Sequence, residues 1–204
     1  MATQSVPAVP PAELTFEEFL DAYDGVHAEW VDGQVYVMSP GNKPQSRLTR
    51  FLASIIQDWA EAHELGEVFV APYTVRVRER AAREPDVFFL RSEHMDRLHG
   101  TFVDGPPDLV IEISSPGSRG LDRGEKFFEY AEAGVAEYWL IDPERKRVEA
   151  YRRGGEGGAY DPVPLGEPPV LRSEALPGMG IAVEWLWAEP LPKQAWVREQ
   201  WGLA

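Results

Sequence analysis

The sequence predicts a mixed α/β domain in which a central mixed β-sheet is flanked by helices. Two apolar segments, 85–90 and 107–116, are rich in β-branched or aromatic residues and are bounded by Pro, Ser or Gly, as buried strands are. A third segment, 46–63, repeats its apolar residues every three or four positions, which indicates an amphipathic helix. At 204 residues with 44% apolar residues, the chain can form one such domain with a sizeable core.

The first half of the chain is expected to contain both helices and strands. Thr15, followed by two glutamates, has the pattern of a helix cap, and Asp32-Gly33 between two alternating segments is the sequence of a tight hairpin turn. The elements expected here are a helix from Thr15 to about Gly25, a hairpin of 28–31 and 34–38, the helix at 46–63, and strands at 67–71, 74–78 and 85–90.

The second half continues the mixed pattern. The expected elements are a polar helical stretch at 92–98, a strand at 109–113, a helix at 121–133 closed by Gly134, a strand pair at 138–143 and 148–151, a loop at 152–169, and a strand with a helical turn at 176–187. In the helix at 121–133, Asp122, Lys126 and Tyr130 are four residues apart and share one side, while Phe127 and Phe128 can face the core.

Three regions are expected along the chain. Residues 1–13, rich in Pro and Ala, predict a flexible lead-in, and 14–187 form the domain. Residues 188–204 predict a tail, with Trp196, Val197 and Trp201 at the spacing of a short helix that covers a surface or meets a second subunit. The first residues show no signal peptide and no segment is long enough for a membrane span, so a cytoplasmic protein is expected.

Composition limits the chemistry. With no cysteine, the chain has neither disulfides nor thiolate metal sites. A formal charge of −14 opposes a nucleic-acid partner, because such a field repels a polyanion. The segment from 33 to 57, however, has no acidic residue and carries Lys43, Arg47 and Arg50. These three side chains are the candidate phosphate contacts.

Two carboxylates on neighbouring strands suggest a metal site. Glu112 lies within an apolar strand, where a carboxylate is costly unless it is paired or binds a cation, and Asp86 opens the other strand. Adjacent strands would bring both to one end of the sheet, with the backbone carbonyl of Ile113 as a third ligand. Mg²⁺ or Mn²⁺ is the expected ion, because Mg²⁺ prefers oxygen ligands and keeps several waters.

Lys126 and Glu29 complete the candidate catalytic set. Lys126, on the helix after the Glu112 strand, would orient the attacking water or neutralise developing charge, and Glu29 would support the ion directly or through water. Structural alternatives exist for each residue: Asp86 can end a turn, Glu112 can pair with an arginine, and Lys126 and Glu29 can be solvated.

Other kinds of site fit the sequence less well. The four histidines lack the HExxH spacing of a zinc hydrolase, no phosphate-binding loop of the GxxxxGK[ST] type is present, and Ser114-Ser115 lacks a nucleophile-elbow context. The tryptophans of the C-terminal segment are more typical of a core or an interface than of a base-stacking platform. A metal-dependent phosphodiester hydrolase therefore remains the favoured class.

As a set, the motifs resemble the Uma-two family of restriction endonucleases, in the PD-(D/E)XK nuclease superfamily. The resemblance covers about residues 14–187, and each motif alone is weak. The matching stretches are 29–40, Arg83-Glu84-Pro85-Asp86, 107–116, Asp122 through Lys126 to Tyr130, 138–143 and Leu176-Pro177-Gly178.

This resemblance implies a restriction-endonuclease-like core and a site formed by Glu29, Asp86, Glu112 and Lys126. The chain departs from the pattern at two positions. The superfamily's lysine usually stands two residues after the second carboxylate, where this chain has Ser114, so Lys126 takes that role. Relatives commonly carry a histidine where this chain has Gln45, which would weaken metal or phosphate binding if that histidine assists it.

The sequence thus predicts a Mg²⁺- or Mn²⁺-dependent endonuclease acting on DNA, as a homodimer so that two sites cut two strands. Two alternatives remain open. One is a catalytically weak or inactive module of the same fold that binds protein partners, which the acidic composition and Gln45 favour. The other is hydrolysis of a different phosphodiester, such as RNA or a nucleotide.

Overall fold

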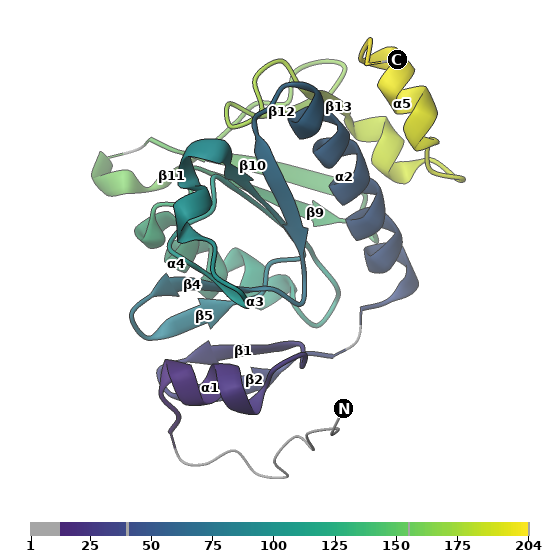
Figure 1. Ribbon diagram of the computed structural model, residues 1–204. Helices are drawn as coiled ribbons and strands as arrows, with labels where there is room; N and C mark the ends of the chain where they lie inside the picture. Colours follow the sequence, from purple (N-terminus) through teal and green to yellow (C-terminus); the bar gives the residue numbers. More distant parts are fainter. Residues whose placement is uncertain (1–12, 40, 155, 204) are drawn as a thin grey trace.

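The computed structural model describes residues 13–39, 41–154 and 156–203. Its largest sheet has six strands in the order β11-β10-β9-β8-β6-β3, with β8 and β9 parallel and the other neighbours antiparallel (Figure 1). The strands of this main sheet are β3 (Gly66–Val70), β6 (Val87–Arg91), β8 (Leu109–Ile113), β9 (Glu137–Asp142), β10 (Arg147–Arg153) and β11 (Tyr160–Pro162).

A second, five-stranded sheet has the order β2-β1-β5-β4-β7 and begins with the hairpin. Its turn at Asp32 and Gly33 has positive φ at both residues, 49° and 87°, as a type I′ turn requires. Its strands are β1 (Ala28–Val31), β2 (Gln34–Val37), β4 (Thr74–Arg78), β5 (Ala81–Arg83) and β7 (Phe102–Asp104); a separate pair is formed by β12 (Val170–Arg172) and β13 (Gly180–Ala182).

Helices cover the sheets. The α-helices are α1 (Phe16–Ala22), α2 (Lys43–Ala62), α3 (Arg119–Arg123), α4 (Glu125–Ala133) and α5 (Gln194–Gln200), and the 3₁₀ turns are η1 (Ser92–Arg97), η2 (Glu156–Gly158) and η3 (Val183–Trp187). Thr15 caps α1 with a reciprocal hydrogen-bond pair to Glu18. In the part of the chain that the structure describes, no helix has the length and apolarity to cross a bilayer.

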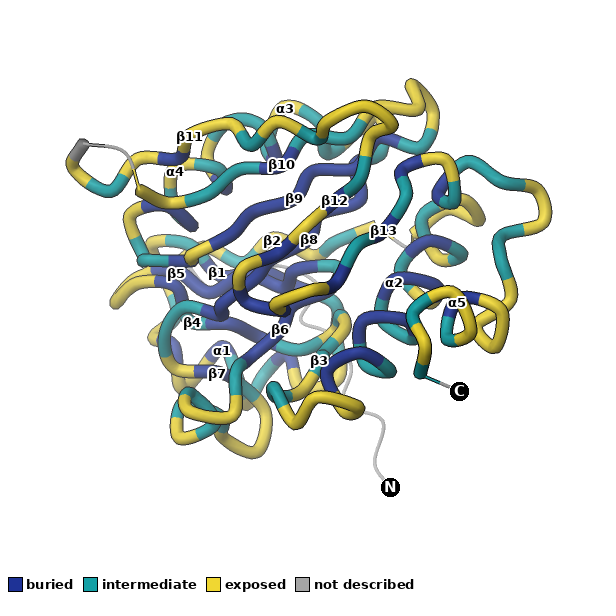
Figure 2. Tube along the Cα trace, turned by 90° about the horizontal axis from the view of Figure 1, so that it is seen from above, coloured by how far each residue is buried: buried dark blue, intermediate teal, exposed yellow. Residues whose placement is uncertain are grey.

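The main sheet separates two cores, because successive strand residues point to opposite faces. Val87 and Ile111 pack with the apolar side of α2, whereas Phe88, Val110 and Tyr130 pack on the other face, with α4 and β4. The central strands β6, β8 and β9 lie deep in the molecule (Figure 2). Glu112 shares the face of Val110, so its side chain points toward α4 and the second sheet.

The predicted mixed α/β fold is confirmed, with differences at several elements. The long helix begins at Lys43 rather than Ser46, because Asn42 caps it and Pro44 fits a first turn. The expected helix at 121–133 is two helices broken at Gly124, whose ψ of −102° is not helical. Phe128 is 63% exposed rather than in the core. Within the expected loop at 152–169 lie η2 and β11.

Two further predicted strands and a helix in the C-terminal tail also form. The strands expected at 67–71 and 74–78 form, but they belong to different sheets. The tail forms α5, where Trp201 packs edge-on against Trp59 of α2 at 5.4 Å between ring centroids. The lead-in expected at 1–13 lies outside the described residues except for Glu13.

Candidate active site

A cavity of about 710 Å³ lies between the hairpin, the start of α2, the ends of β6 and β8, and α3–α4. All four residues of the predicted catalytic set line it. Six acidic side chains and two basic ones face this space: Glu29, Glu84, Asp86, Glu112, Asp122 and Glu125, against Arg83 and Lys126. The cavity therefore has the negative character that a divalent cation would neutralise.

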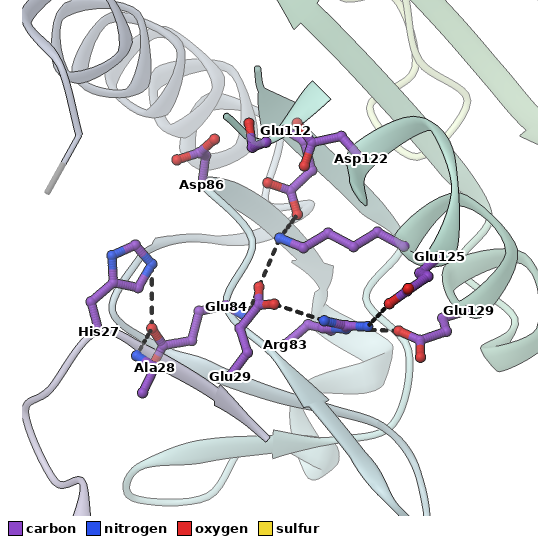
Figure 3. A network of polar contacts seen from close by, with 12 residues as sticks. His27, Ala28, Glu29, Arg83, Glu84, Asp86, Glu112, Asp122, Glu125 and Glu129 are labelled. Atoms are coloured by element: carbon purple, nitrogen blue, oxygen red, sulfur yellow. Dashed lines mark hydrogen bonds and ion pairs between the residues drawn. The ribbon is translucent and has the colours of Figure 1, made fainter. Parts of the chain in front are cut away.

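Sheet register brings the two predicted metal ligands together. β6 and β8 are antiparallel neighbours, and the pairing of Val87 with Ile111 places Asp86 opposite Glu112 on the same face. The backbone N–H of Ile113 donates to Asp86 Oδ2 at 2.7 Å, so this residue contacts the site through its amide. Asp86, Glu112 and Asp122 lie near one another in Figure 3, and all three line the cavity.

Lys126 bridges two of the other predicted residues, Glu29 and Glu112. Its Nζ lies 2.7 Å from Glu29 Oε1, on the hairpin, and 3.0 Å from Glu112 Oε1, on the main sheet. The Tyr130 hydroxyl, one turn further along α4, donates to the same Glu112 oxygen at 2.9 Å. Because both contacts reach Oε1, Oε2 of Glu112 has no hydrogen bond or ion pair to the described residues.

Arg83 is a site residue that the sequence reasoning did not identify. Its Nη1 lies 2.8 Å from Glu29 Oε2 and its Nε lies 2.7 Å from Glu129, so Arg83 links these two carboxylates (Figure 3). Lys126 contacts the other Glu29 oxygen, Oε1. Its Nη2 is buried without a hydrogen bond, 3.7 Å from Glu125. In the sequence, the position of Arg83 in the Arg83-Glu84-Pro85-Asp86 motif, three residues before Asp86, could have indicated that it lies near the site.

Glu84 and Asp122 also belong to the site. Glu84 accepts from the Ala28 N–H at 3.1 Å and lies 3.4 Å from His27 Nε2. Asp122 accepts from the Ser114 hydroxyl at 2.9 Å. Ser114, the position where the resemblance implies a lysine in the wider superfamily, thus supports a neighbouring carboxylate. The four-residue spacing of Asp122 and Lys126 in the sequence indicated that both face one site.

Gln45 enters the site directly. Its side-chain amide donates to both carboxylate oxygens of Asp86, at 3.0 and 3.3 Å. Gln45, the position where the family resemblance implies a histidine, therefore contacts a candidate metal ligand, and its amide competes with a cation for these oxygens.

The charges of the site follow from burial and pairing. Burial raises the pKa of Glu112 to about 8 and that of Asp86 to about 6. Burial acts on Glu29 in the same direction, but Lys126 and then Arg83 hold its pKa below the usual range. Burial alone would lower the pKa of Lys126, but the Glu112 and Glu29 carboxylates raise it above the usual value. Lys126 is therefore an ammonium at neutral pH.

The donor set fits a hydrated Mg²⁺ or Mn²⁺. In the described part of the chain, no group of three or more His, Asp or Glu side chains is arranged as a complete metal site. Asp86 and Glu112 provide two carboxylates, and Mg²⁺ commonly binds through one or two, with water and substrate phosphate as further ligands. The excess of acidic side chains in the cavity supplies the compensating charge.

The three candidate phosphate contacts lie on α2 at different distances from the site. Arg50 lines a groove that shares His27, Gln45 and Asp86 with the main cavity. Arg47 is ion-paired with Glu189 at 3.2 Å, and Lys43 is exposed at the first turn of the helix. Of the three, Arg50 is thus the one placed next to the site.

Comparisons with known proteins agree with this architecture. A family model, Uma2, described as “Putative restriction endonuclease”, matches residues 16–184. “Uncharacterized protein slr1290” of Synechocystis sp. is 27% identical over 156 residues, covering 74% of this chain and 80% of that protein. The crystal structure of “a putative nuclease belonging to DUF820” from Anabaena variabilis covers 90% of this chain and 99% of its own, with a TM-score of 0.72 and 17% identity. The latter similarity confirms the predicted restriction-endonuclease-like fold.

Proposed function

The chain belongs to the Uma2 family, and from this membership and the geometry of the cavity we propose that it is a metal-dependent endonuclease that hydrolyses DNA phosphodiester bonds. One observation carries the proposal: Lys126 Nζ lies between Glu29 and Glu112, and Glu112 stands opposite Asp86, in a cavity that a substrate can enter. Carboxylates and an ammonium around one space are the groups needed to bind a cation, position water and offset phosphoryl charge.

Asp86 and Glu112 would hold the ion, with the backbone carbonyl of Ile113 as the third protein ligand and Glu29 supporting the ion directly or through water. When bound, Mg²⁺ or Mn²⁺ polarises a phosphoryl oxygen and lowers the pKa of coordinated water. The raised pKa values of Asp86 and Glu112 mean that binding a cation would favour their ionised forms, so protons are released when it binds.

Lys126 acts as a fixed cation in this proposal. An ammonium with a raised pKa is a poor base, so Lys126 orients the attacking water and offsets the charge that develops on the phosphoryl oxygens. Glu29 and Arg83 hold it in place from the hairpin side. The chain's own contribution to catalysis is thus a preorganised charge arrangement.

Phosphates next to the scissile bond would contact α2. Arg50 borders the groove that joins the cavity, and Lys43 and Arg47 lie on the same helix. We expect substitution of Arg50 by Ala to weaken DNA binding and to flatten its dependence on salt concentration, because fewer counterions are released. An unchanged salt slope would remove this residue from the DNA-contact set.

A nicking assay on supercoiled plasmid tests the proposed function. We expect the wild-type protein to nick the plasmid with Mg²⁺ or Mn²⁺ and not with EDTA. Asp86→Asn, which removes one charge at nearly constant shape, should abolish nicking, while Asp32→Asn in the exposed hairpin turn should leave it unchanged. Equal activity of Asp86→Asn and wild type would show that the nuclease site lies elsewhere.

A second candidate function is a binding or assembly module that keeps the nuclease fold without useful catalysis. The contact of Gln45 with both oxygens of Asp86 favours it, because that amide competes with a cation. Gln45→Ala separates the two functions: if the amide alone suppresses activity, this variant should nick plasmid faster than wild type. Absence of metal binding in both proteins would favour the binding module.

The proposed assembly is a homodimer, because two sites are needed to cut both strands at one locus. Sedimentation equilibrium at several protein concentrations tests it directly, and a monomer at all concentrations would contradict it. A cytoplasmic location likewise stays a prediction.

A further inference from the structure

Tyr36 presents an aromatic ring to the active-site cavity. In the hairpin register it stands directly across from Glu29, so the two side chains share one face of the second sheet. Tyr36 is 54% exposed and lines the cavity. A large aromatic side chain thus borders the proposed reaction site on the wall that also carries Glu29.

Among the described residues, no hydrogen bond or ring contact holds the Tyr36 ring in place. Tyr36 makes no hydrogen bond and no ring contact with any of them, whereas the neighbouring Trp30 donates to the Leu14 carbonyl at 2.9 Å and packs against Phe16. Exposed aromatic residues without such contacts are more typical of binding surfaces than of a folded core. Tyr36 is therefore available to a ligand.

The cavity is lined by apolar side chains, Tyr36 among them, as well as acidic ones. Its other apolar residues come from the hairpin and from the segment before α4: Val31, Val37, Met38, Pro116 and Leu121. Both basic groups of the cavity are already paired, since Lys126 contacts Glu29 and Glu112 and Arg83 contacts Glu29 and Glu129. A ligand therefore meets no unpaired lysine or arginine among the described residues that line the cavity, and contact with its apolar or aromatic part would add to its binding.

The depth of the site limits the form of the substrate. Glu112 and Lys126 are each only 3% exposed, so a phosphodiester group meets them only after it enters the cavity. A base inside an intact duplex stack has no free face to offer Tyr36, whereas an unpaired base does. A cavity of about 710 Å³ lies within the range of about 300–1,000 Å³ that is usual for ligand pockets.

We propose that Tyr36 stacks on an unpaired nucleobase next to the scissile phosphate, so that the protein binds single-stranded or locally unpaired DNA in preference to intact duplex. This inference rests on the proposed function and adds a substrate class to it. Stacking requires no free cation, which agrees with a cavity whose lysine and arginine are both engaged.

Fluorescence of an oligonucleotide that carries 2-aminopurine tests the stacking, because emission of this base falls when it stacks. The probe is used as a single strand and as a blunt duplex of the same sequence, with wild-type protein and Ca²⁺ in place of Mg²⁺. We expect the single strand to be quenched and to bind about 10-fold more tightly than the duplex, within the range expected for one stacked base.

Variants at Tyr36 make the test specific. Tyr36→Ala should lose the quenching and weaken single-strand binding about 10-fold, whereas Tyr36→Phe should retain both because the ring stays. Phe128→Ala removes an aromatic residue that is 63% exposed on α4 but lies outside the cavity, and it should behave as wild type. Equal binding of single strand and duplex, or unchanged quenching with Tyr36→Ala, would overturn the inference.

The two proposals fail in different ways. Tyr36-dependent quenching without nicking by any divalent cation would contradict the proposed endonuclease and support the base-binding site. Metal-dependent nicking in which Tyr36→Ala cleaves single strand and duplex at wild-type rates would support the endonuclease and overturn the role of Tyr36.

Discussion

One chain of ion pairs runs from the candidate active site to the surface, and its two ends differ in their access to water. At the inner end, Glu112, Lys126, Glu29 and Arg83 are in contact in this order, and their exposed fractions are only 1–3%. Glu129 links Arg83 to the outer end, where Arg78, Asp32 and Arg80 have side chains that are 38–58% exposed.

The distances at the two ends are similar, so geometry alone does not distinguish them. The inner contacts span 2.7–3.0 Å, and Arg78 lies 2.9 Å from Asp32. Water screens the outer pairs, which therefore add little to stability, whereas charges removed from water are costly and must keep all their partners. Burial of a lysine and two carboxylates gives weak stabilisation at best, which agrees with the proposed catalytic role of the inner cluster.

The largest expected effect is loss of activity on replacing Lys126. Lys126→Met should lower the nicking rate by about 10²–10³-fold, as removal of one preorganised charge-stabilising group does in other enzymes. The variant should also lose stability, because Glu29 then keeps only Arg83 as a basic partner, so nicking is compared at a temperature at which circular dichroism shows both proteins folded. Lys193→Met, outside the cavity, is the control; comparable nicking by both variants would contradict the role of Lys126.

Loss of Arg83 should destabilise the fold more than any change at the outer end. Arg83→Gln leaves Glu29 and Glu129 without their shared guanidinium, and a broken buried pair costs about 3–5 kcal/mol. Urea unfolding followed by circular dichroism measures this difference. Arg83→Lys, which restores the charge but not the planar fork, should recover only part of it. A stability equal to wild type would show that the buried cluster is not held by Arg83.

The pH dependence of stability should reveal the acidic site. Glu112 has a pKa of about 8 in the folded protein, against 4.5 for an ordinary glutamate, so the folded state holds its proton more tightly than the unfolded state does. The contribution of this proton to the free energy of unfolding is fully present below pH 4.5 and is lost as pH rises through 8. Asp86, with a pKa of about 6, acts in the same direction over a narrower range. The unfolding midpoint in EDTA should therefore fall as pH rises from 5 to 8.

Mg²⁺ should reverse this loss, because a bound cation favours the ionised carboxylates. Thermal unfolding with and without saturating Mg²⁺ should show a shift that grows with pH, by about 2–4 °C for each kcal/mol of added stability. In the Asp86→Asn variant, the Mg²⁺-induced shift in unfolding temperature should increase less with pH. A Mg²⁺ shift of the same size at pH 5 and pH 8 would contradict proton-coupled metal binding at these residues.

The smallest effect is expected at the outer end. Arg78→Ala removes contacts with Asp32 and Glu129, but its own side chain is 38% exposed, so the loss should stay below about 1 kcal/mol after screening by solvent. Nicking should be unchanged. A loss as large as that of Arg83→Gln, measured in the same urea series, would show that the whole ion-pair chain acts as one unit.

Local patterns in the sequence were sufficient for most of the fold. The Asp32-Gly33 turn, the cap at Thr15 and the apolar spacing of the helix at 46–63 each depend on residues only a few positions apart. The strands β5, β7 and β12 have three residues each, too few for a periodic signal, and each forms by pairing with other strands of its sheet. Short elements of this kind cannot be predicted locally.

The site was predictable to a similar degree. Asp86 and Glu112 could be found because a carboxylate in an apolar strand is unusual, and Lys126 because the family resemblance and the helical spacing agree. Arg83 could not, since its partners Glu29 and Glu129 are 54 and 46 residues away. Its role depends on how the hairpin packs against α4, which no local pattern contains.

Locating a bound ion is the test of the proposed metal site at Asp86 and Glu112. Crystals grown with Mn²⁺ and measured at a wavelength with strong manganese anomalous scattering would locate the ion without an activity assay. We expect an anomalous peak bonded to Asp86 and Glu112, with the Gln45 amide moved away from at least one Asp86 oxygen, and no such peak in Asp86→Asn crystals. A cavity without a peak at saturating Mn²⁺, or a peak that persists unchanged in Asp86→Asn, would contradict it.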